Sequence, residues 1–519
     1  MHNLLTDDVI SVQRGETASP VRVTLPDVFA ELSSSRSRGV RFPHLRNHHR
    51  QGLYMFLVQL GALALINETT STPPDRSGDW RRLLRALTDD YDRDQPWHLV
   101  TEDLRDPAFM QAPIEGQNWE EFSEIYPYPD QIDIPYVTKN HELKRHRIAH
   151  PDLDHWLFSL ITCQTMRGGG YGGYNYGICR MNGGYGSRPW VGIVPSADWG
   201  DQFRRDVGVL CEHRSQLKRE YDFYDFDDGI KLTWLEPWDG ETSLGLDQLD
   251  PYFIEICRQV RMGKKDGETV IYKNNSTARR VAGADLEGKT GDPWTPVEDQ
   301  EKGLSVSERG FDYEVLRQIV TTDGYDPGLC MEHIEDDPDA VFLRAFALAC
   351  GQGKTNGIHS RFLHVSEPVK RQLLNPTSRS RLADVSREMV ETAGDVARSV
   401  LRPALLALVQ GGKDDLNFQS DKPSEWLDRF RRRVDERFFP FFWNQIEDHM
   451  DQEDGDRVIL RHWEEELDDI GQSLLEEAKE ALPVPDARKY RAFARADQLY
   501  YGSRADNLQL LQEDEEATP

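Results

Sequence analysis

Two glycine-containing stretches hold the residues best suited to contact a ligand through the protein backbone. The first covers residues 168–186 and reads GGGYGGYNYGICRMNGGYG, so aromatic residues and asparagine interrupt the glycines. Because glycine has no Cβ, the backbone amides of such a segment can approach a flat surface closely, and φ can be positive. A phosphate and the minor groove of duplex DNA are surfaces of this kind. A tight structural loop would have the same composition, so both interpretations stay open.

The second stretch, Gly351–Gly357, reads GQGKTNG and follows an apolar run. Gly-Lys-Thr suggests a P-loop, and hence a nucleotide-binding enzyme. That motif needs a glycine five residues before the Gly-Lys pair, where this chain has Leu348. A polar, glycine-flanked tip that carries Lys354 and Asn356 and inserts into a groove fits the residues better. An ordinary exposed turn is the remaining alternative.

Histidines and aspartates that could bind a metal gather between residues 141 and 155. Their spacing matches no zinc motif, and basic residues lie among them, which favours a solvated basic loop able to contact RNA phosphates. The six cysteines form no C-x-x-C pair. We therefore expect no metal and no cofactor. The residues of this cluster are His141, His146, His150, Asp152, Asp154 and His155.

The composition limits the function classes further. The chain has 519 residues, enough for two or more domains, and a formal net charge of −28. A strongly acidic protein repels phosphates at long range, so it does not coat nucleic acid by itself. Either it has no nucleic-acid role, or it makes a few local contacts while a basic partner supplies the rest. No signal-peptide pattern begins the chain and no apolar run is long enough to span a bilayer, so we expect a cytoplasmic protein.

The apolar pattern predicts an α+β fold. Leu53–Ile66 is apolar nearly all round and predicts a buried helix, and Leu249–Met262 predicts another. After residue 375, apolar residues recur every three to four positions in four long segments joined by short loops, which predicts a four-helix bundle. We expect a large mixed N-terminal domain over residues 1–370, followed by the bundle over residues 376–519. The four segments are Thr377–Val409, Ser424–Met450, Asp456–Leu482 and Asp486–Asn507.

A series of short motifs, taken in order, resembles the CasA family, the large subunit of the type I-E CRISPR Cascade surveillance complex. Together they cover most of the first 360 residues, whereas the bundle is similar only in kind. The motifs lie at residues 3–7 (NLLTD), 56–65 (FLVQLGALAL), 106–111 (DPAFMQ), 138–141 (TKNH), 176–184 (YGICRMNGG), 186–189 (GSRP), 236–240 (EPWDG), 291–296 (GDPWTP) and 351–355 (GQGKT).

The resemblance implies a non-catalytic subunit in antiviral defence. Such a subunit recognises the PAM in double-stranded DNA through the minor groove, helps to start target unwinding and R-loop formation, and offers a docking surface to the helicase-nuclease. The implied partners are the other Cascade subunits, the 5′ handle of the guide RNA and the PAM-containing duplex. A purely structural scaffold is the alternative function, beside the nucleotide-binding enzyme.

The resemblance also implies particular binding residues, and it implies neither a catalytic residue nor a metal ligand. A glycine loop would read the PAM, a wedge loop with Asn356 at its tip would enter the duplex end, and a basic finger would lie within residues 278–289. A further loop would contact the RNA handle. The residues are Gly170, Tyr171, Gly172, Gly173, Tyr174 and Asn175 in the glycine loop; Lys354, Thr355, Asn356 and Gly357 in the wedge; Arg280 or Lys289 in the finger; and Lys139, Asn140, His141 and Lys144 in the handle loop.

Overall fold

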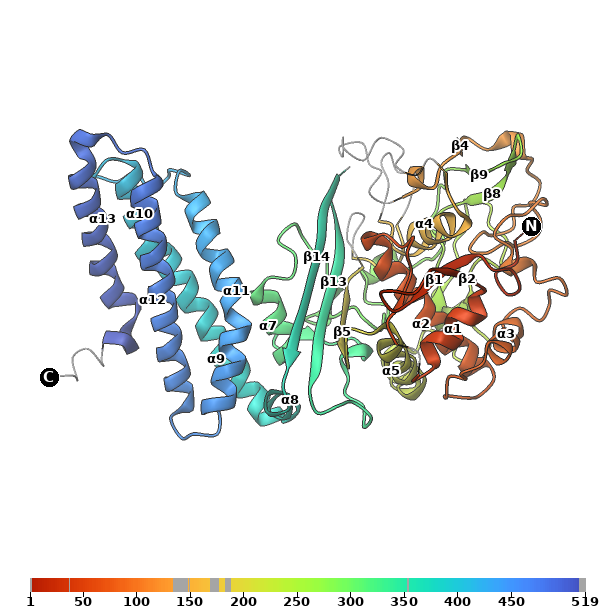
Figure 1. The fold of residues 1–519 in the computed structure, drawn as a ribbon, viewed down its shortest axis with the longest axis horizontal. Coiled ribbons are helices and arrows are strands. Elements are labelled where there is room, and N and C mark those ends of the chain that lie inside the picture. The colour runs from red at the N-terminus through yellow and green to blue at the C-terminus, as the bar shows by residue number, and fades with distance from the viewer. Residues whose placement is uncertain are drawn as a thin grey trace. The chain divides into compact units, whose positions relative to one another are not determined.

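The computed structural model describes residues 2–36, 38–133, 148, 150–168, 177–182, 188–351 and 354–512, which form two compact units. Unit 1 comprises Met1–Phe311 and Gly324–His364, and unit 2 comprises Asp312–Asp323 and Val365–Pro519. Mixed helices and strands make up unit 1 and helices make up unit 2 (Figure 1), so the predicted α+β class with a C-terminal bundle is confirmed. Within the described residues, no helix is long and apolar enough to cross a membrane. The domain boundary at residues 370–376 stays a prediction.

The first elements of unit 1 form a small sheet and a capped helix. Strand β1 pairs antiparallel with both β2 and β3. Helix α1 begins after Thr24, whose hydroxyl accepts a hydrogen bond from the Asp27 amide while the Asp27 carboxylate accepts one from the Thr24 amide. This capping box satisfies two amides that the helix cannot pair internally. The elements are β1 (Ile10–Arg14), β2 (Val21–Val23), α1 (Leu25–Ser33) and β3 (Val40–Arg41).

Helix α2 (Arg50–Asn67) is the centre of unit 1, and its residues from Gln51 to Leu65 are all buried. This confirms the buried helix that the apolar run predicts. Gly61 lets two aromatic rings pack against the helix, because a Cβ there would lie 3.1 Å from Phe203 and 3.3 Å from Phe29. The helices packed around α2 are α3 (Ser77–Ala86), α4 (Leu153–Thr165) and α5 (Trp199–Glu212), and α6 (Arg214–Glu220) follows α5.

The predicted helix over Leu249–Met262 is wrong, since two strands occupy this stretch. β7 (Leu249–Ile254) pairs parallel with β6, and β8 (Val260–Lys265) pairs antiparallel with β9. Every residue of β7 is buried, so the strand shows no polar–apolar alternation and its pattern is the same as that of a buried helix. The remaining strands here are β4 (Glu124–Tyr126), β6 (Ile230–Leu232) and β9 (Glu268–Lys273).

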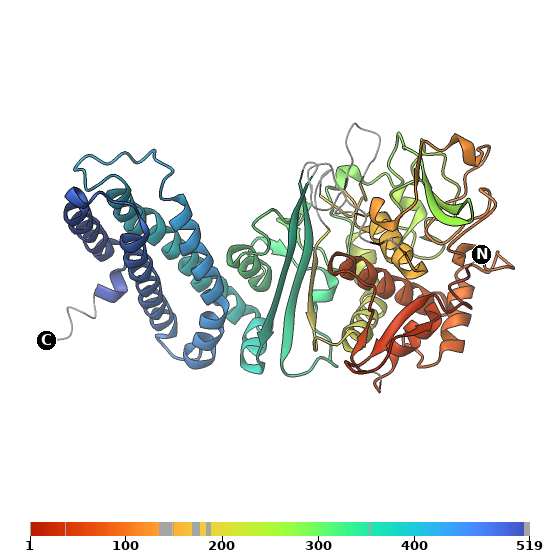
Figure 2. The same ribbon diagram turned by 45° about the horizontal axis from the view of Figure 1, so that its top comes forward.

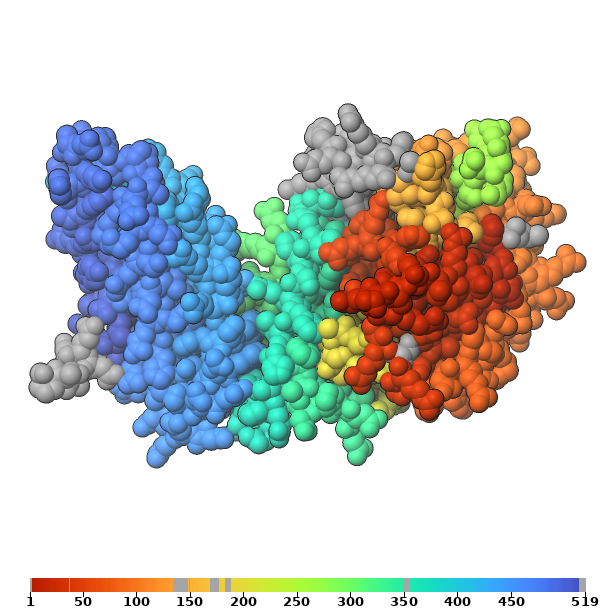
Figure 3. Space-filling view, viewed as in Figure 1, coloured from red at the N-terminus to blue at the C-terminus, as the bar shows by residue number. Residues whose placement is uncertain are grey.

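The long strands β13 (Val341–Gly351) and β14 (Lys354–Val365) lie side by side in a sheet of order β14-β13-β5, with β5 at Trp190–Val194 (Figures 1 and 2). β13 is largely buried, whereas β14 is the edge strand and reaches the surface on the face seen in Figure 3. A further small sheet consists of β10 (Val297–Glu298), β11 (Lys302–Gly303) and β12 (Tyr325–Asp326).

Unit 2 contains the four long helical segments that the sequence predicts. The first is interrupted by a π-helical turn, Val396–Leu401, that leads to Pro403. Proline has no amide hydrogen and its ring clashes with the preceding turn, which explains the irregularity. Pro440, by contrast, lies inside a continuous helix. The helices are α7 (Tyr313–Thr321), α8 (Glu367–Leu374), α9 (Pro376–Asp395), α10 (Arg402–Val409), α11 (Ser424–His449), α12 (Gly455–Ala481) and α13 (Asp486–Asn507).

Candidate nucleic-acid interface

The predicted wedge residues lie in the edge strand β14 and not at the tip of a loop. Lys354, of which only the backbone is described, begins the strand, and Asn356 is its third residue. Asn356 is partly exposed, and Gly357 is exposed with φ +110° and open space around a Cβ position. The turn itself, residues 352 and 353, falls outside the described residues. Thr355 and Asn356 therefore lie within strand β14, next to the turn of the hairpin.

This geometry contradicts the nucleotide-binding alternative. In a P-loop the lysine and threonine open a helix whose N-terminus holds the phosphates. Here Lys354 and Thr355 open a strand that pairs with β13. The described part of this segment has no helix N-terminus to hold a triphosphate, so the geometry of a P-loop is absent at Lys354 and Thr355.

The two faces of β14 have different surroundings. Arg361 Nε donates to the Phe311 carbonyl at 3.0 Å, and Gly310, with φ +73°, lies directly against His359. A Cβ at Gly310 would overlap the His359 ring, so only glycine fits there. Burial lowers the pKa of His359. The alternate residues Ile358 and Ser360 are exposed, which leaves one face of the strand free for a partner.

The glycine-loop residues Gly170–Asn175 lie outside the described residues, but the two ends of their segment are firmly held. The Ile178 amide donates to the Arg167 carbonyl at 3.2 Å, and the Arg258 guanidinium donates to the Gly168 carbonyl at 2.8 Å. These hydrogen bonds bring residues 167 and 178 together. The structure thus fixes the base from which the predicted PAM-reading loop leaves unit 1.

A buried carboxylate completes this base. The Cys179 amide donates to both oxygens of Glu255 at 2.9 Å, and Glu255 is buried beside β7. Burial raises the pKa of Glu255 to about 7, although the Cys179 amide and the guanidinium groups of Arg180 and Arg188 act in the opposite direction. A carboxyl group in this state carries a proton over part of the physiological pH range.

Of the two predicted basic-finger residues, Arg280 has a structural role. Its guanidinium is only 3% exposed and donates to three backbone carbonyls, and burial lowers its pKa to about 10. It also lies over the Trp238 ring, 5.6 Å from the ring centroid. A guanidinium enclosed in this way cannot reach DNA, which argues against Arg280 as the finger. The three carbonyls belong to Thr233, Glu236 and Pro237.

Lys289 is the finger candidate that solvent reaches, because it is partly exposed. Its Nζ donates to the Gln300 carbonyl at 2.6 Å, and it lines a cavity together with Glu220, Asp292 and Asp326. Contact with a phosphate would require the ammonium group to leave both the carbonyl and these acidic neighbours. Lys289 stays a prediction.

The four RNA-handle residues, 139, 140, 141 and 144, also fall outside the described residues. On one side of them, Asp133 Oδ2 accepts from His48 Nε2 at 2.8 Å and from His49 Nε2 at 3.0 Å. Burial alone would raise the pKa of Asp133, but the two histidines outweigh it and hold that pKa well below its usual range. The Ile148 amide, on the far side, donates to Asp130 Oδ2 at 3.0 Å. The segment therefore starts and ends at one place in unit 1.

The structure also gathers four possible ligand atoms that the sequence pattern does not connect. His44 lies against Asp154, from which it is separated by 110 residues, at the first turn of α4. Asp152 and His155 complete the group. Sequence spacing groups Asp152, Asp154 and His155 with residues 141–150 and leaves His44 out.

Comparison with known proteins shows a likeness in structure alone. No protein-family model and no curated protein sequence matches the chain. The structure of Thermobifida fusca Cse1 matches with a TM-score of 0.61 at 15% identity, over 98% of each chain. That of Thermus thermophilus CasA (Cse1) matches with a TM-score of 0.59 at 15% identity, over 98% of this chain and 99% of the other. The CRISPR-associated protein Cse1 from Acidimicrobium ferrooxidans gives 0.58 at 13% identity, over 98% and 99%. The chain therefore has, along nearly its whole length, the fold of the CasA (Cse1) proteins that its motifs resemble.

Proposed function

We propose that the chain is the large subunit of a type I-E CRISPR Cascade complex and that it recognises the PAM in double-stranded DNA. The observation that carries the proposal is the likeness to CasA (Cse1) structures over 98% of the chain. The ordered motifs of the sequence support it independently. In this role the chain helps to start unwinding and R-loop formation and offers a docking surface to the helicase-nuclease. It has no catalytic activity and no cofactor for this function.

The chemistry of the exposed end of β14 suits contact with the minor groove. The groove displays acceptors at every base pair and one guanine donor, so its readout is permissive. Asn356 offers both a donor and an acceptor, and the neighbouring Gly357 leaves room for a base edge or sugar. Because these residues extend a long sheet, they can press against a duplex end without yielding. Unstacking one base step costs a few kcal/mol, which a rigid insertion can offset.

The net charge of −28 is compatible with this function if other components of the complex make most of the contacts to nucleic acid. Guide-RNA pairing carries most of the sequence specificity in RNA-guided recognition, and the protein reads only the short PAM. The other Cascade subunits and the guide RNA 5′ handle hold the complex together, and basic partners neutralise the DNA backbone. An acidic subunit then needs only a few local contacts.

Replacement of Asn356 by alanine is expected to reduce the preference for a PAM-containing duplex about tenfold, because a polar contact to a base edge is worth about 1–3 kcal/mol. Gly173→Asp is expected to reduce it at least as strongly, since a carboxylate would face the DNA phosphates. The measurement is binding of PAM-containing and PAM-scrambled duplexes by the reconstituted complex at one fixed salt concentration. Ser360→Ala, an exposed change further along β14, is the matched control and should leave the preference intact.

Complex assembly, followed by gel filtration, separates the outcomes. If both variants assemble and lose the PAM preference, the glycine loop and the start of β14 read the PAM. If both assemble and keep the full preference, the PAM role is wrong and the scaffold is the better interpretation. A wild-type complex that shows no PAM preference at all would also overturn the proposal.

A further inference from the structure

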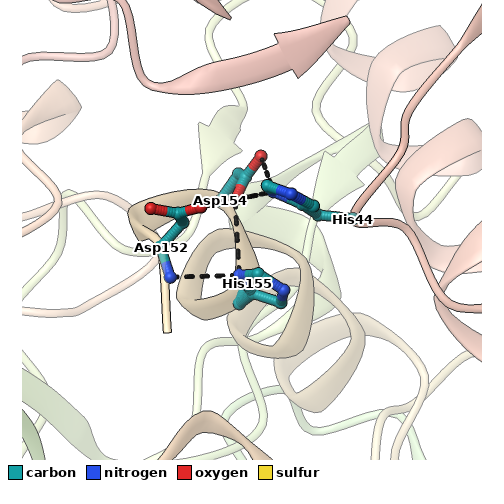
Figure 4. Close-up of side chains that lie close together, drawn as sticks. All are labelled: His44, Asp152, Asp154 and His155. Carbon is teal, nitrogen blue, oxygen red and sulfur yellow. Dashed lines mark hydrogen bonds and ion pairs between the residues drawn. The ribbon is translucent and has the colours of Figure 1, made fainter. Parts of the chain in front are cut away.

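Two histidines and two aspartates surround one point at the start of α4. Figure 4 shows the Asp154 carboxylate joined by dashed lines to His44 and to His155, whose rings stack on each other, with Asp152 nearby. The four ligand atoms lie within 4.8 Å of one another. His44 follows β3, and the other three residues belong to the N-cap and first turn of α4. The cluster therefore joins two separate parts of unit 1.

The distances between these atoms combine one hydrogen bond with two separations that a shared ion would bridge. His44 Nδ1 lies 2.9 Å from Asp154 Oδ1 and 3.8 Å from Asp152 Oδ2, and His155 Nδ1 lies 3.6 Å from Asp154 Oδ1. Zinc binds histidine nitrogen and carboxylate oxygen at about 2.0–2.1 Å in tetrahedral geometry, which separates the ligand atoms by about 3.3 Å. Two of the three observed separations are too long for hydrogen bonds. The three separations, 2.9, 3.6 and 3.8 Å, lie on both sides of the tetrahedral value, so small movements of the side chains would place all the ligand atoms around one ion.

His155 Nδ1 is in the protonation state that a metal ligand requires. The Asp152 amide donates to it at 3.1 Å, and because an amide only donates, this nitrogen carries no proton. The hydrogen bond is part of the capping box of α4 and occupies the nitrogen's one lone pair, while Asp154 Oδ1 lies 3.6 Å away. A bound ion would therefore replace the Asp152 amide as the partner of this nitrogen.

Charge balance gives an independent reason. The Asp154 side chain is 0% exposed, and among the described residues no lysine or arginine lies within 4 Å of it. An ionised carboxylate buried in this way needs a compensating charge. The Ser11 amide donates to Oδ2 at 3.1 Å but brings no charge. Arg22 pairs with Asp152 at 2.6 Å, which still leaves the four side chains and Arg22 with one negative charge in excess if both imidazoles are neutral.

The neighbouring cluster of His48, His49 and Asp133 shows what a hydrogen-bond network looks like. Both histidines contact the same Asp133 oxygen, at 2.8 and 3.0 Å, which are ordinary hydrogen-bond lengths. Arg46 also lies 3.4 Å from that oxygen and supplies the positive charge. At Asp154 only His44 lies at hydrogen-bond length, and none of the described lysines and arginines forms an ion pair with this carboxylate, so the cluster of His48, His49 and Asp133 is a suitable control.

We propose that His44, Asp152, Asp154 and His155 bind one divalent transition-metal ion of the kind that prefers mixed nitrogen and oxygen ligands, with zinc as its representative. His44 is 31% and Asp152 42% exposed, so an ion can enter from solvent. The bound ion ties the segment after β3 to the first turn of α4. It thereby fixes the C-terminal side of residues 139–144. The site is structural, because all four positions are filled by the protein, and it does not depend on the proposed function.

The test is the zinc content of the purified full-length chain after equilibration with buffered Zn²⁺ and gel filtration. We expect about one zinc per chain in the wild type and in His48→Asn, and less than about 0.2 in His44→Gln and in Asp152→Asn. These two ligands are partly exposed, so their replacement leaves the core intact; circular dichroism checks this. Co²⁺ in place of Zn²⁺ should give the visible absorption of a tetrahedral ion, which His44→Gln abolishes.

Each alternative result is decisive. A wild-type chain that binds no zinc or cobalt at micromolar free metal overturns the proposal. So does a metal content that His44→Gln and Asp152→Asn leave unchanged, because the ion would then lie elsewhere. A wild-type melting temperature that rises with Zn²⁺, while that of His44→Gln does not, would support the site through a second readout.

Discussion

Replacement of Arg261 by methionine is expected to lower the free energy of unfolding of unit 1 by about 4 kcal/mol. The guanidinium is 0% exposed and donates four hydrogen bonds, each of 2.7–3.0 Å, to backbone carbonyls. Burial lowers the pKa of Arg261 to about 9, so the charge is held at a cost that these carbonyls offset. Methionine fills much of the space but donates no hydrogen bond, so all four carbonyls lose a donor, although the Thr101 hydroxyl still donates to Asp103 and the Ala108 amide to Gln111. The four carbonyls belong to Asp103, Asp106, Gln111 and Ala112.

The measurement is denaturant unfolding with hydrogen exchange at the α2 amides, which reports on unit 1 separately from the helical unit. Arg105→Met is the matched control, since Arg105 is exposed and forms an exposed ion pair with Asp103, and it should produce no measurable change. If the two variants unfold at the same denaturant concentration, the buried carbonyl network does not stabilise the fold.

Arg261 also shows what the resemblance motifs do. Two of the four carbonyls that accept from Arg261 lie in the motif at residues 106–111. In the same motif, the Gln111 side chain donates to the Leu99 carbonyl at 3.0 Å. The motifs 186–189 and 291–296 meet in the buried pair of Arg188 and Asp292, 2.6 Å apart. Residues of this kind are constrained by packing in the core. The motifs are therefore good evidence for the fold and only indirect evidence for the ligand.

The elements that the sequence predicts correctly are those with a complete apolar pattern. The helical segments of unit 2 have apolar residues every three or four positions over their whole length, and this period predicts a helix. Helix α2 is apolar on every side, and its length of 18 residues favours a helix over a strand. The stretch containing β7 and β8 fails for the opposite reason. Its residues are buried on both faces, and only tertiary contacts distinguish a strand from a helix there.

For the candidate sites, too, the sequence predicts what a local pattern determines and misses what tertiary contacts determine. The sequence could locate the hairpin that carries Asn356, because its glycines and polar residues interrupt an apolar run. It could not show that Asn356 lies within a strand, since the pairing with β13 decides this. The role of Arg280 depends on carbonyls more than 40 residues earlier in the chain, and the contact between His44 and Asp154 spans 110 residues. Contacts of this range have no local pattern.

The stability of unit 1 is expected to decrease by about 2–3 kcal/mol between pH 5 and pH 8 through Glu255 alone, and Glu255→Gln should remove this decrease. The pKa of Glu255 is about 7 in the folded chain, raised from the ordinary value of 4.5 chiefly by burial. Between these two pKa values the folded state binds more protons than the unfolded state. The free energy of unfolding therefore falls as the pH rises through this window. Glutamine keeps an oxygen that can accept from the Cys179 amide, now without a charge to bury.

Denaturant unfolding of the wild type and of Glu255→Gln at both pH values tests this, with the exposed Glu241→Gln as control. The variant should be the more stable protein at pH 8 and nearly equal to the wild type at pH 5. A difference of the same size at both pH values would mean that Glu255 is ionised throughout, held by Arg180 and Arg188. The result also bears on the glycine loop, because Glu255 holds the Cys179 amide at its base. An ionised carboxylate accepts a hydrogen bond more strongly than a protonated one, so this contact is expected to hold at pH 8 although unit 1 as a whole is less stable there.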